Sequence, residues 1–167
     1  MEGVERNQVR LLPHREEWAL EYAEVARRLA AALGENALEI QHVGSTAIRG
    51  ICAKPILDVA VRVVTFAKLD GVARLGYEAC GESGVPGRFL FVLREGGHLS
   101  LQHIHCYEDG NPAFQKQVKF RDYLNAHPEE ARKYDRLKRE LAEKYPESRS
   151  LYTAGKETFI QRILELA

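Results

Sequence analysis

The sequence has no excess of charge of either sign, because 24 Lys and Arg residues balance 24 Asp and Glu residues over 167 positions. A chain without net charge generates no long-range field that attracts a polyanion, which argues against long nucleic acid as the partner. Long hydrophobic runs are also missing, and no stretch approaches the roughly 20 apolar residues that span a bilayer. We therefore expect neither a protein that binds long nucleic acid nor a membrane protein.

The sequence has only three cysteines, and their spacing matches no known pairing motif. Cys52, Cys80 and Cys106 are odd in number and form no CxxC motif, which argues against a disulfide framework or a zinc ribbon. The first residues, MEGVERNQVRLLPHREEW, are charged and hold no apolar run of the kind found in a signal peptide. We expect a cytoplasmic protein with reduced cysteines.

No linker rich in Pro, Gly or Ser, no repeat and no low-complexity segment divides the chain. We therefore expect residues 1–167 to form one domain, which is long enough for a single core. The sequence gives no indication of oligomeric state.

Hydrophobic periodicity divides the chain into three regions. A helix is predicted within residues 12–36, with Pro13 near its start and Gly34 just past its end. Strands are predicted at 37–44, 54–64, 77–80, 88–95 and 98–108, with a helix at 66–76 capped by Thr65. Helices are predicted at 111–127, 128–145 and 148–167. The pattern indicates an α+β fold: a mixed sheet of about five strands with flanking helices and a C-terminal helical block.

The stretch GSTAIRGICAKPILDVAV, residues 44–61, has the features of a phosphate site. Gly44 lets the backbone turn sharply and approach a ligand closely. A short helix that begins at Ser45 would direct backbone N–H groups, including that of Thr46, at an anion. Lys54 follows in the returning segment. These residues are candidates for phosphate binding.

Asp58 is a carboxylate within an otherwise apolar strand. An ionised carboxylate in such a place is costly unless it is paired or binds a metal. Two interpretations of Asp58 are open. It pairs with Lys54 or with a helix arginine and has a structural role, or it binds a metal and is catalytic. The residues alone do not decide between them.

His103 and His105 lie two positions apart on a predicted strand and therefore share a face. If that strand lies near Asp58, the three side chains form an Asp-His-His set, which suits a transition metal such as Mn²⁺ or Zn²⁺ better than Mg²⁺. Two half-buried histidines bonded to carbonyls would leave the same HxH pattern.

Basic residues follow the apolar stripes of the C-terminal helices: Arg121, Lys138 and Lys156. Each could extend along an apolar surface with its charge in water. Together they could instead neutralise a shared anionic ligand, or the carboxylates of Asp58 and Asp122. Arg88, which follows the loop GESGVPG, is predicted at the edge of the same pocket.

The motif HVGSTAIRGICAKPILDVAV resembles the signature of the GrpB family. The likeness continues in HIH (103–105), FRDYL (120–124), YDRLKRELA (134–142) and YTAGKETFI (152–160), and the opening VRLLPHREEWALEYAEVARRL also fits. The resemblance implies a nucleotidyltransferase-like fold related to polymerase β. In that superfamily a Gly-Ser turn precedes a strand with two aspartates separated by one residue. Gly44, Ser45 and Asp58 match, but Ala60 stands where the second aspartate is expected.

The resemblance implies a nucleotidyltransferase-like protein that binds a nucleotide or another phosphorylated small molecule, with a divalent metal (Mg²⁺, Mn²⁺ or Zn²⁺) and an atypical transfer mechanism. Ala60 keeps an alternative open, a non-catalytic ligand-binding or accessory module. Some relatives are fused to dephospho-CoA kinase, which fits such a role. A metal-dependent hydrolase built on Asp58, His103 and His105 is a further alternative.

Overall fold

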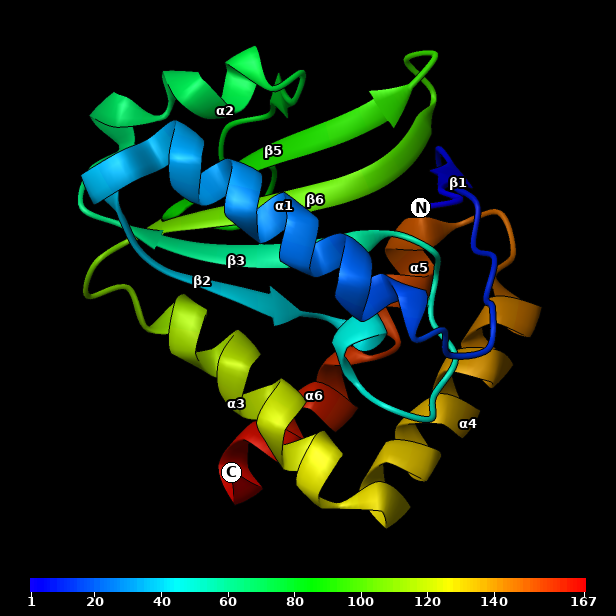
Figure 1. Ribbon diagram of the computed structural model, residues 1–167. Coiled ribbons are helices and arrows are strands. Elements are labelled where there is room, and N and C mark those ends of the chain that lie inside the picture. Colours follow the sequence, from blue (N-terminus) through cyan, green and yellow to red (C-terminus); the bar gives the residue numbers. More distant parts are fainter.

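The computed structural model describes residues 1–167 and is built around a six-stranded mixed sheet (Figure 1). Its main path runs in the order β2 (Ala37–Val43), β3 (Leu57–Val63), β6 (Leu99–Glu108), β5 (Arg88–Glu95) and β4 (Glu78–Ala79). A short β1 (Val4–Glu5) pairs with the start of β6. Only β3 and β6 run parallel. The predicted α+β class is confirmed, and the strand that the sequence did not indicate, β1, is only two residues long.

Helices precede, interrupt and follow the sheet. They are α1 (Glu17–Leu33), α2 (Asp70–Arg74), α3 (Pro112–Ala126), α4 (Pro128–Lys144), α5 (Arg149–Ala154) and α6 (Glu157–Leu166). The cap predicted at Thr65 is present, and the side chains of Asn111 and Ser148, where two further helices were predicted to begin, also accept hydrogen bonds from backbone N–H groups. The helix predicted at 66–76 is divided into a 3-10 turn, η3 (Phe66–Lys68), and α2.

The last predicted helix is also divided, into α5 and α6. The interruption falls at Gly155, where a side chain would collide with Leu141 of α4. The missing side chain lets the α5–α6 junction approach α4 closely, and glycine is itself a poor helix former.

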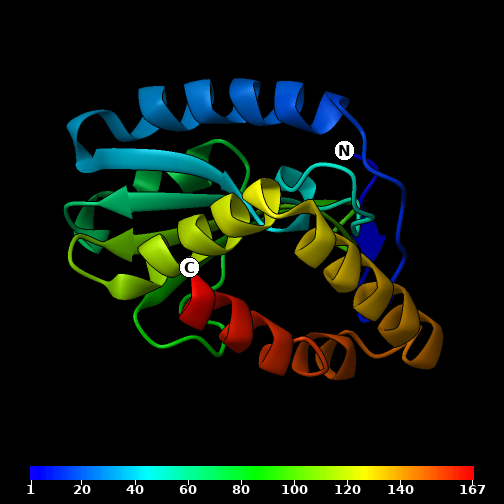
Figure 2. The same ribbon diagram turned by 90° about the horizontal axis from the view of Figure 1, so that it is seen from below.

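One face of the sheet is covered by α1, which lies along it in Figure 2. Alternation on β3 directs Leu57, Val59 and Val61 toward this side, where they form one core cluster with Val25 and Leu29 of α1. Burial of these apolar side chains is the main stabilising contribution to this layer.

The opposite face carries the C-terminal helices, which lie on the other side of the sheet from α1 in Figure 2. Helix α3 seals part of this face, where Phe114 packs with Val43, Ala60 and Tyr107. A further cluster joins α3, α4 and α6 to the loop that follows β2. The start of β3 and the middle of β6 stay free of this packing, and the cavity described below lies there.

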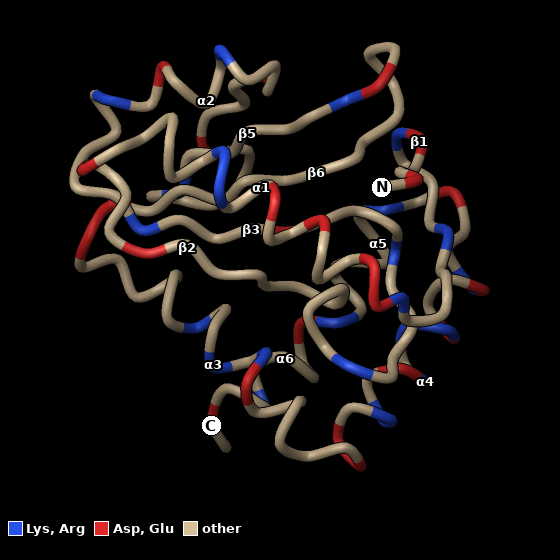
Figure 3. The backbone as a smooth tube through the Cα atoms, viewed as in Figure 1, with Lys and Arg blue, Asp and Glu red and all other residues tan.

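No helix in the structure combines the length and apolar character needed to cross a bilayer. Figure 3 shows acidic and basic residues interspersed along the chain, as the balanced composition indicates.

Candidate functional site

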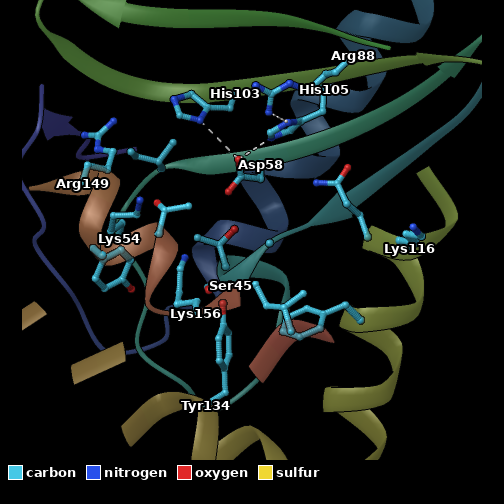
Figure 4. Close-up of a pocket in the computed structure, with 18 of the residues that line it drawn as sticks. Ser45, Lys54, Asp58, Arg88, His103, His105, Lys116, Tyr134, Arg149 and Lys156 are labelled. Atoms are coloured by element: carbon cyan, nitrogen blue, oxygen red, sulfur yellow. Dashed lines mark hydrogen bonds and ion pairs between the residues drawn. The ribbon is translucent and has the colours of Figure 1, made fainter. Parts of the chain in front are cut away.

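A cavity of about 450 Å³ lies between the β3–β6 pair and the C-terminal helices (Figure 4). It is lined by Gly44, Ser45, Thr46, Lys54, Ile56, Asp58, Arg88, His103, His105, Lys116, Gln117, Phe120, Tyr134, Arg149, Tyr152, Thr153, Lys156, Ile160 and Leu164. Asp58 is the only acidic residue of this lining, whereas five lining residues are Lys or Arg.

The parallel register of β3 and β6 brings the predicted Asp-His-His set together. Asp58 is the register partner of His103, and His105 lies two residues further along the same face. The Oδ1 atom of Asp58 lies 2.8 Å from Nε2 of His105 and 3.7 Å from Nδ1 of His103. Ligand atoms of the three residues all lie within 4.8 Å of one another, close enough to hold one metal ion.

The turn at Gly44 packs closely against this carboxylate. Its φ angle is 73°, and a Cβ atom there would lie 2.6 Å from Oδ2 of Asp58. The turn after β2 can therefore pack against Asp58 only because residue 44 has no side chain. The helix predicted after it is a single 3-10 turn, η2 (Ser45–Ala47).

The charges in the cavity are set by burial and by their neighbours. Burial alone would raise the pKa of Asp58, but the hydrogen bond with His105 and the charges of both histidines and Lys54 lower it to about 2. Burial lowers the pKa of His103 to about 4, although the charge of Asp58 opposes this. At neutral pH Asp58 is therefore ionised and His103 is neutral, which are the forms that bind metals.

The contact with Arg88 selects one tautomer for a neutral His105. Its Nη1 atom lies 3.2 Å from Nδ1 of His105. Since a guanidinium only donates, Nδ1 accepts, and a neutral His105 carries its proton on Nε2 and donates it to Asp58. A metal-binding imidazole usually directs its second N–H at a carboxylate or carbonyl instead. The donor set fits a transition metal, but only after Arg88 has moved away from His105.

Nine of the residues predicted as site residues line the cavity: Gly44, Ser45, Thr46, Lys54, Asp58, Arg88, His103, His105 and Lys156. The hydroxyl of Thr46 is hydrogen-bonded to Nε2 of His42 at 2.8 Å, so it already has a partner within the protein. Whether the lining residues bind a ligand stays a prediction.

Two predicted positions were wrong, because Arg121 and Lys138 do not line the cavity. Arg121 points toward β2 and donates to the side chain of Gln41 and the carbonyl of His42, at 2.8 Å each. It also pairs with Asp122. Lys138 is fully buried behind the cavity wall, where it donates to the carbonyl of Cys52. Burial lowers the pKa of Lys138 to about 7.

Ala60, where the superfamily pattern places a second aspartate, lies outside the cavity. Its side chain is fully buried in the cluster that Phe114 of α3 covers. The sheet face therefore has an open half at Asp58 and a sealed half at Ala60. A two-metal centre, which needs carboxylates that bridge two cations, has no space at position 60.

Arg149 is the main lining residue that sequence reasoning missed. Its backbone N–H and guanidinium donate to carbonyls of Glu5, Asn7 and Gln8, so its position depends on the N-terminal segment. No local pattern indicates a contact between residues more than 140 positions apart. Lys116 and Gln117 were also missed, although a helix cap at Asn111 places both on α3.

The structure is thus an α+β domain with a basic cavity over a parallel strand pair, consistent with a nucleotidyltransferase-like fold. A family model described as "GrpB protein" matches residues 8–166, and the chain belongs to this family. The crystal structure of conserved protein GrpB from Enterococcus faecalis is similar, with a TM-score of 0.85 and 33% sequence identity. The likeness covers 94% of this chain and 96% of that one.

Curated relatives extend over nearly the whole chain. The glutamate-rich protein GrpB of Alkalihalophilus pseudofirmus is 34% identical over 171 residues, which cover 98% of each chain. The UPF0157 protein YqkA of Bacillus subtilis is 36% identical over 97% of this chain, which spans only 48% of YqkA. A dephospho-CoA kinase of Mycolicibacterium paratuberculosis is 27% identical over 95% of this chain and 46% of its own length. The chain thus spans about half the length of the last two relatives.

Proposed function

We propose that the cavity binds a nucleotide or another phosphorylated small molecule, whose phosphate is held by the basic residues of the lining. One observation carries this proposal: the basic residues that the fold partly buries in the cavity have no acidic partner. They are Lys54, Arg88, Arg149 and Lys156, and none of them forms an ion pair. Unpaired charges in a partly buried site are costly, and an anionic ligand would offset that cost.

Among the partly buried basic residues, lack of an ion pair is confined to the cavity; the fully buried Lys138 also has none, but it donates to a backbone carbonyl and burial lowers its pKa to about 7. The part-buried basic residues outside the cavity are Arg62, Arg94 and Arg121, and each of them is ion-paired. A small anion also agrees with the zero net charge, since attraction of an anion is then confined to one pocket.

Asp58, His103 and His105 would hold one divalent transition metal beside the phosphate. Such a metal supplies Lewis-acid polarisation of a phosphate oxygen. Arg88 would leave His105 for the phosphate, which would free Nδ1 of His105 and place a bidentate donor on the ligand. This arrangement supports metal-assisted reaction at phosphorus, by nucleotidyl transfer or hydrolysis, with Asp58 as the central residue.

A second candidate is a binding or accessory module without transfer chemistry. The sealed position of Ala60 favours it, because the paired aspartates of the superfamily cannot form there. The likeness to half of a dephospho-CoA kinase supports a role beside another domain or protein.

The test combines thermal shift with calorimetry of the full chain. Phosphate, AMP, ADP and ATP are titrated with and without Mn²⁺, Zn²⁺ or Mg²⁺, because a ligand that binds the native state raises Tm. We expect at least one phosphorylated probe to bind, and Mn²⁺ or Zn²⁺ to bind more tightly than Mg²⁺. Asp58→Asn should abolish metal binding, whereas Asp122→Asn, at an exposed acid outside the cavity, should not. Failure of every phosphorylated probe at millimolar concentration would overturn the proposal. Product analysis of the same mixtures separates an enzyme from a binding module.

A further inference from the structure

We infer that the cavity holds two phosphate groups, and that Lys54 and Lys156, which both lie against the ring of Tyr152, form its second anion subsite together with Arg149. This inference rests on the proposed function, because it concerns the same cavity and narrows the ligand class. The ligand is then a diphosphate, or a compound with two separate phosphate groups, and not a simple monophosphate.

The subsite is assembled from separate segments around one fixed ring. Tyr152 of α5 is only 1% exposed. The Nζ atoms of Lys54 and Lys156 lie 5.2 Å and 4.6 Å from the centroid of its ring. Lys54 precedes β3, and Lys156 lies at the start of α6, so residues 102 positions apart bring like charges to the same aromatic side chain.

No acidic side chain forms an ion pair with these residues, and Asp58 offsets the charges of Lys54 and Arg149 only in part. Neither lysine has a hydrogen bond to an acidic side chain or an ion pair. Arg149 donates to the carbonyl oxygens of Glu5 and Gln8, at 2.8 Å and 3.5 Å, which hold the guanidinium in place without cancelling its charge. Burial and the charges of Lys156 and Arg149 together lower the pKa of Lys54 to about 7, although the charge of Asp58 opposes this. The three groups therefore repel one another, and a bound anion would relieve that repulsion.

The second subsite is separate from the Asp58 centre. In Figure 4, Lys54 and Arg149 lie to one side of Asp58, and Arg88 lies with His105 on the other. A single phosphate would leave most of a 450 Å³ cavity empty, since pockets of that size hold whole metabolites.

The charge balance gives the same result. Lys54 is about half protonated at neutral pH, because its pKa is about 7, so the five basic residues and one carboxylate of the lining leave between three and four positive charges before any metal binds. A phosphate monoester carries at most about two negative charges at neutral pH. A second phosphate group supplies the remaining negative charge. The apolar side chains of Phe120, Ile160 and Leu164 are then left to contact the organic part of the ligand.

The test counts anions and uses two probes, inorganic phosphate and pyrophosphate, in buffer without divalent metal. Equilibrium dialysis with radiolabelled probes gives the number bound per chain, and calorimetry gives the affinities. We expect two phosphate ions but one pyrophosphate per chain, with pyrophosphate bound about tenfold more tightly, since one added hydrogen bond between charged groups is worth about that factor.

Lys156→Met removes a charge that has no hydrogen bond or ion pair to lose, so this variant should fold. We expect it to bind one phosphate ion and to lose the tenfold preference for pyrophosphate. The matched control is Lys144→Met, because Lys144 is also unpaired and lies 5.3 Å from a tyrosine ring, that of Tyr145, but outside the cavity. It should behave as wild type.

One phosphate per wild-type chain, with no preference for pyrophosphate, would overturn the two-subsite inference and leave the proposed function standing. Absence of binding by both probes, and by the nucleotides of the preceding section, would overturn the proposed function itself. Equal loss of binding in Lys156→Met and Lys144→Met would show a general charge effect and would also overturn the second subsite.

Discussion

Basic residues outside and inside the cavity differ in where their partners come from. Arg62 of β3 bonds Glu39, its register partner on β2, and Arg94 of β5 bonds Glu78 of the adjacent β4. These pairs form within the sheet and need no other molecule. The cavity residues have backbone carbonyls, a histidine and a tyrosine ring as neighbours instead.

The difference shows which basic residues have an acidic partner within the chain and which have none. A part-buried charge with a partner on the next strand contributes to the fold, although each such pair is worth little. A part-buried charge that lacks a partner is costly to the fold by itself, and the proposed anionic ligand would offset that cost. Substitutions that supply the missing acidic partner, remove an unpaired charge or remove a pair test this difference.

A carboxylate placed in the cavity should have the largest effect. Thr153→Glu puts an acidic group on the exposed surface of α5 that lines the cavity, within the second subsite. It should compete with phosphate for the cations and lower phosphate affinity about a hundredfold in calorimetry, since close like charges repel by several kcal/mol. Thr158→Glu makes the same change on α6 outside the cavity and should have no effect. Equal affinities of the two variants would contradict a cationic site at Thr153.

The buried lysine should control how stability depends on pH. The pKa of Lys138 falls from 10.5 in the unfolded chain to about 7 on folding, so the unfolded chain binds the proton more tightly between these values. Stability should therefore rise with pH, by about 2 kcal/mol from pH 7 to 9 for this residue alone. Lys138→Met should remove this part of the pH dependence in urea unfolding. Lys133→Met, an exposed paired lysine on the same helix, should keep it. An unchanged slope in Lys138→Met would place the titration elsewhere.

Arg88 should favour phosphate and oppose metal. Arg88→Met removes the donor to Nδ1 of His105, so His105 can take the tautomer that binds a metal through Nε2. We expect Zn²⁺ affinity to rise about tenfold and phosphate affinity to fall about tenfold, both measured by calorimetry. Arg94→Met, on the same strand but paired with Glu78, should change neither. A fall in both affinities would show that Arg88 supports the metal centre.

Much of the fold could be predicted from local patterns. The apolar run of residues 54–64 predicted a strand, and Thr65, Asn111 and Ser148 marked helix starts with side chains that bond the backbone. These signals lie within a few residues, so tertiary contacts do not alter them. The two-residue β1 was missed because its pairing depends on a remote strand.

The part of the site that could be predicted is the part whose geometry follows from strand periodicity. Residues two apart on a strand share a face, so the pairing of His103 with His105 needed no structure. Their contact with Asp58 depends on the parallel register of two strands more than 40 positions apart, which the sequence does not encode locally. The two wrong placements have the same origin. Helical periodicity shows that Arg121 and Lys138 turn inward, but not what lies opposite them.

Removal of Arg121 should have the smallest effect, and on stability alone. Arg121→Met eliminates the hydrogen bonds to Gln41 and the His42 carbonyl, but an apolar side chain of similar length keeps the packing of α3 on β2. We expect a loss of about 1 kcal/mol in urea unfolding and unchanged affinity for phosphate. Lys119→Met, an exposed residue of the same helix, should change neither. A tenfold loss of phosphate affinity in Arg121→Met would mean that this arginine turns into the cavity when the ligand binds. A paired cation would then serve the ligand, and the division between paired and unpaired basic residues would fail.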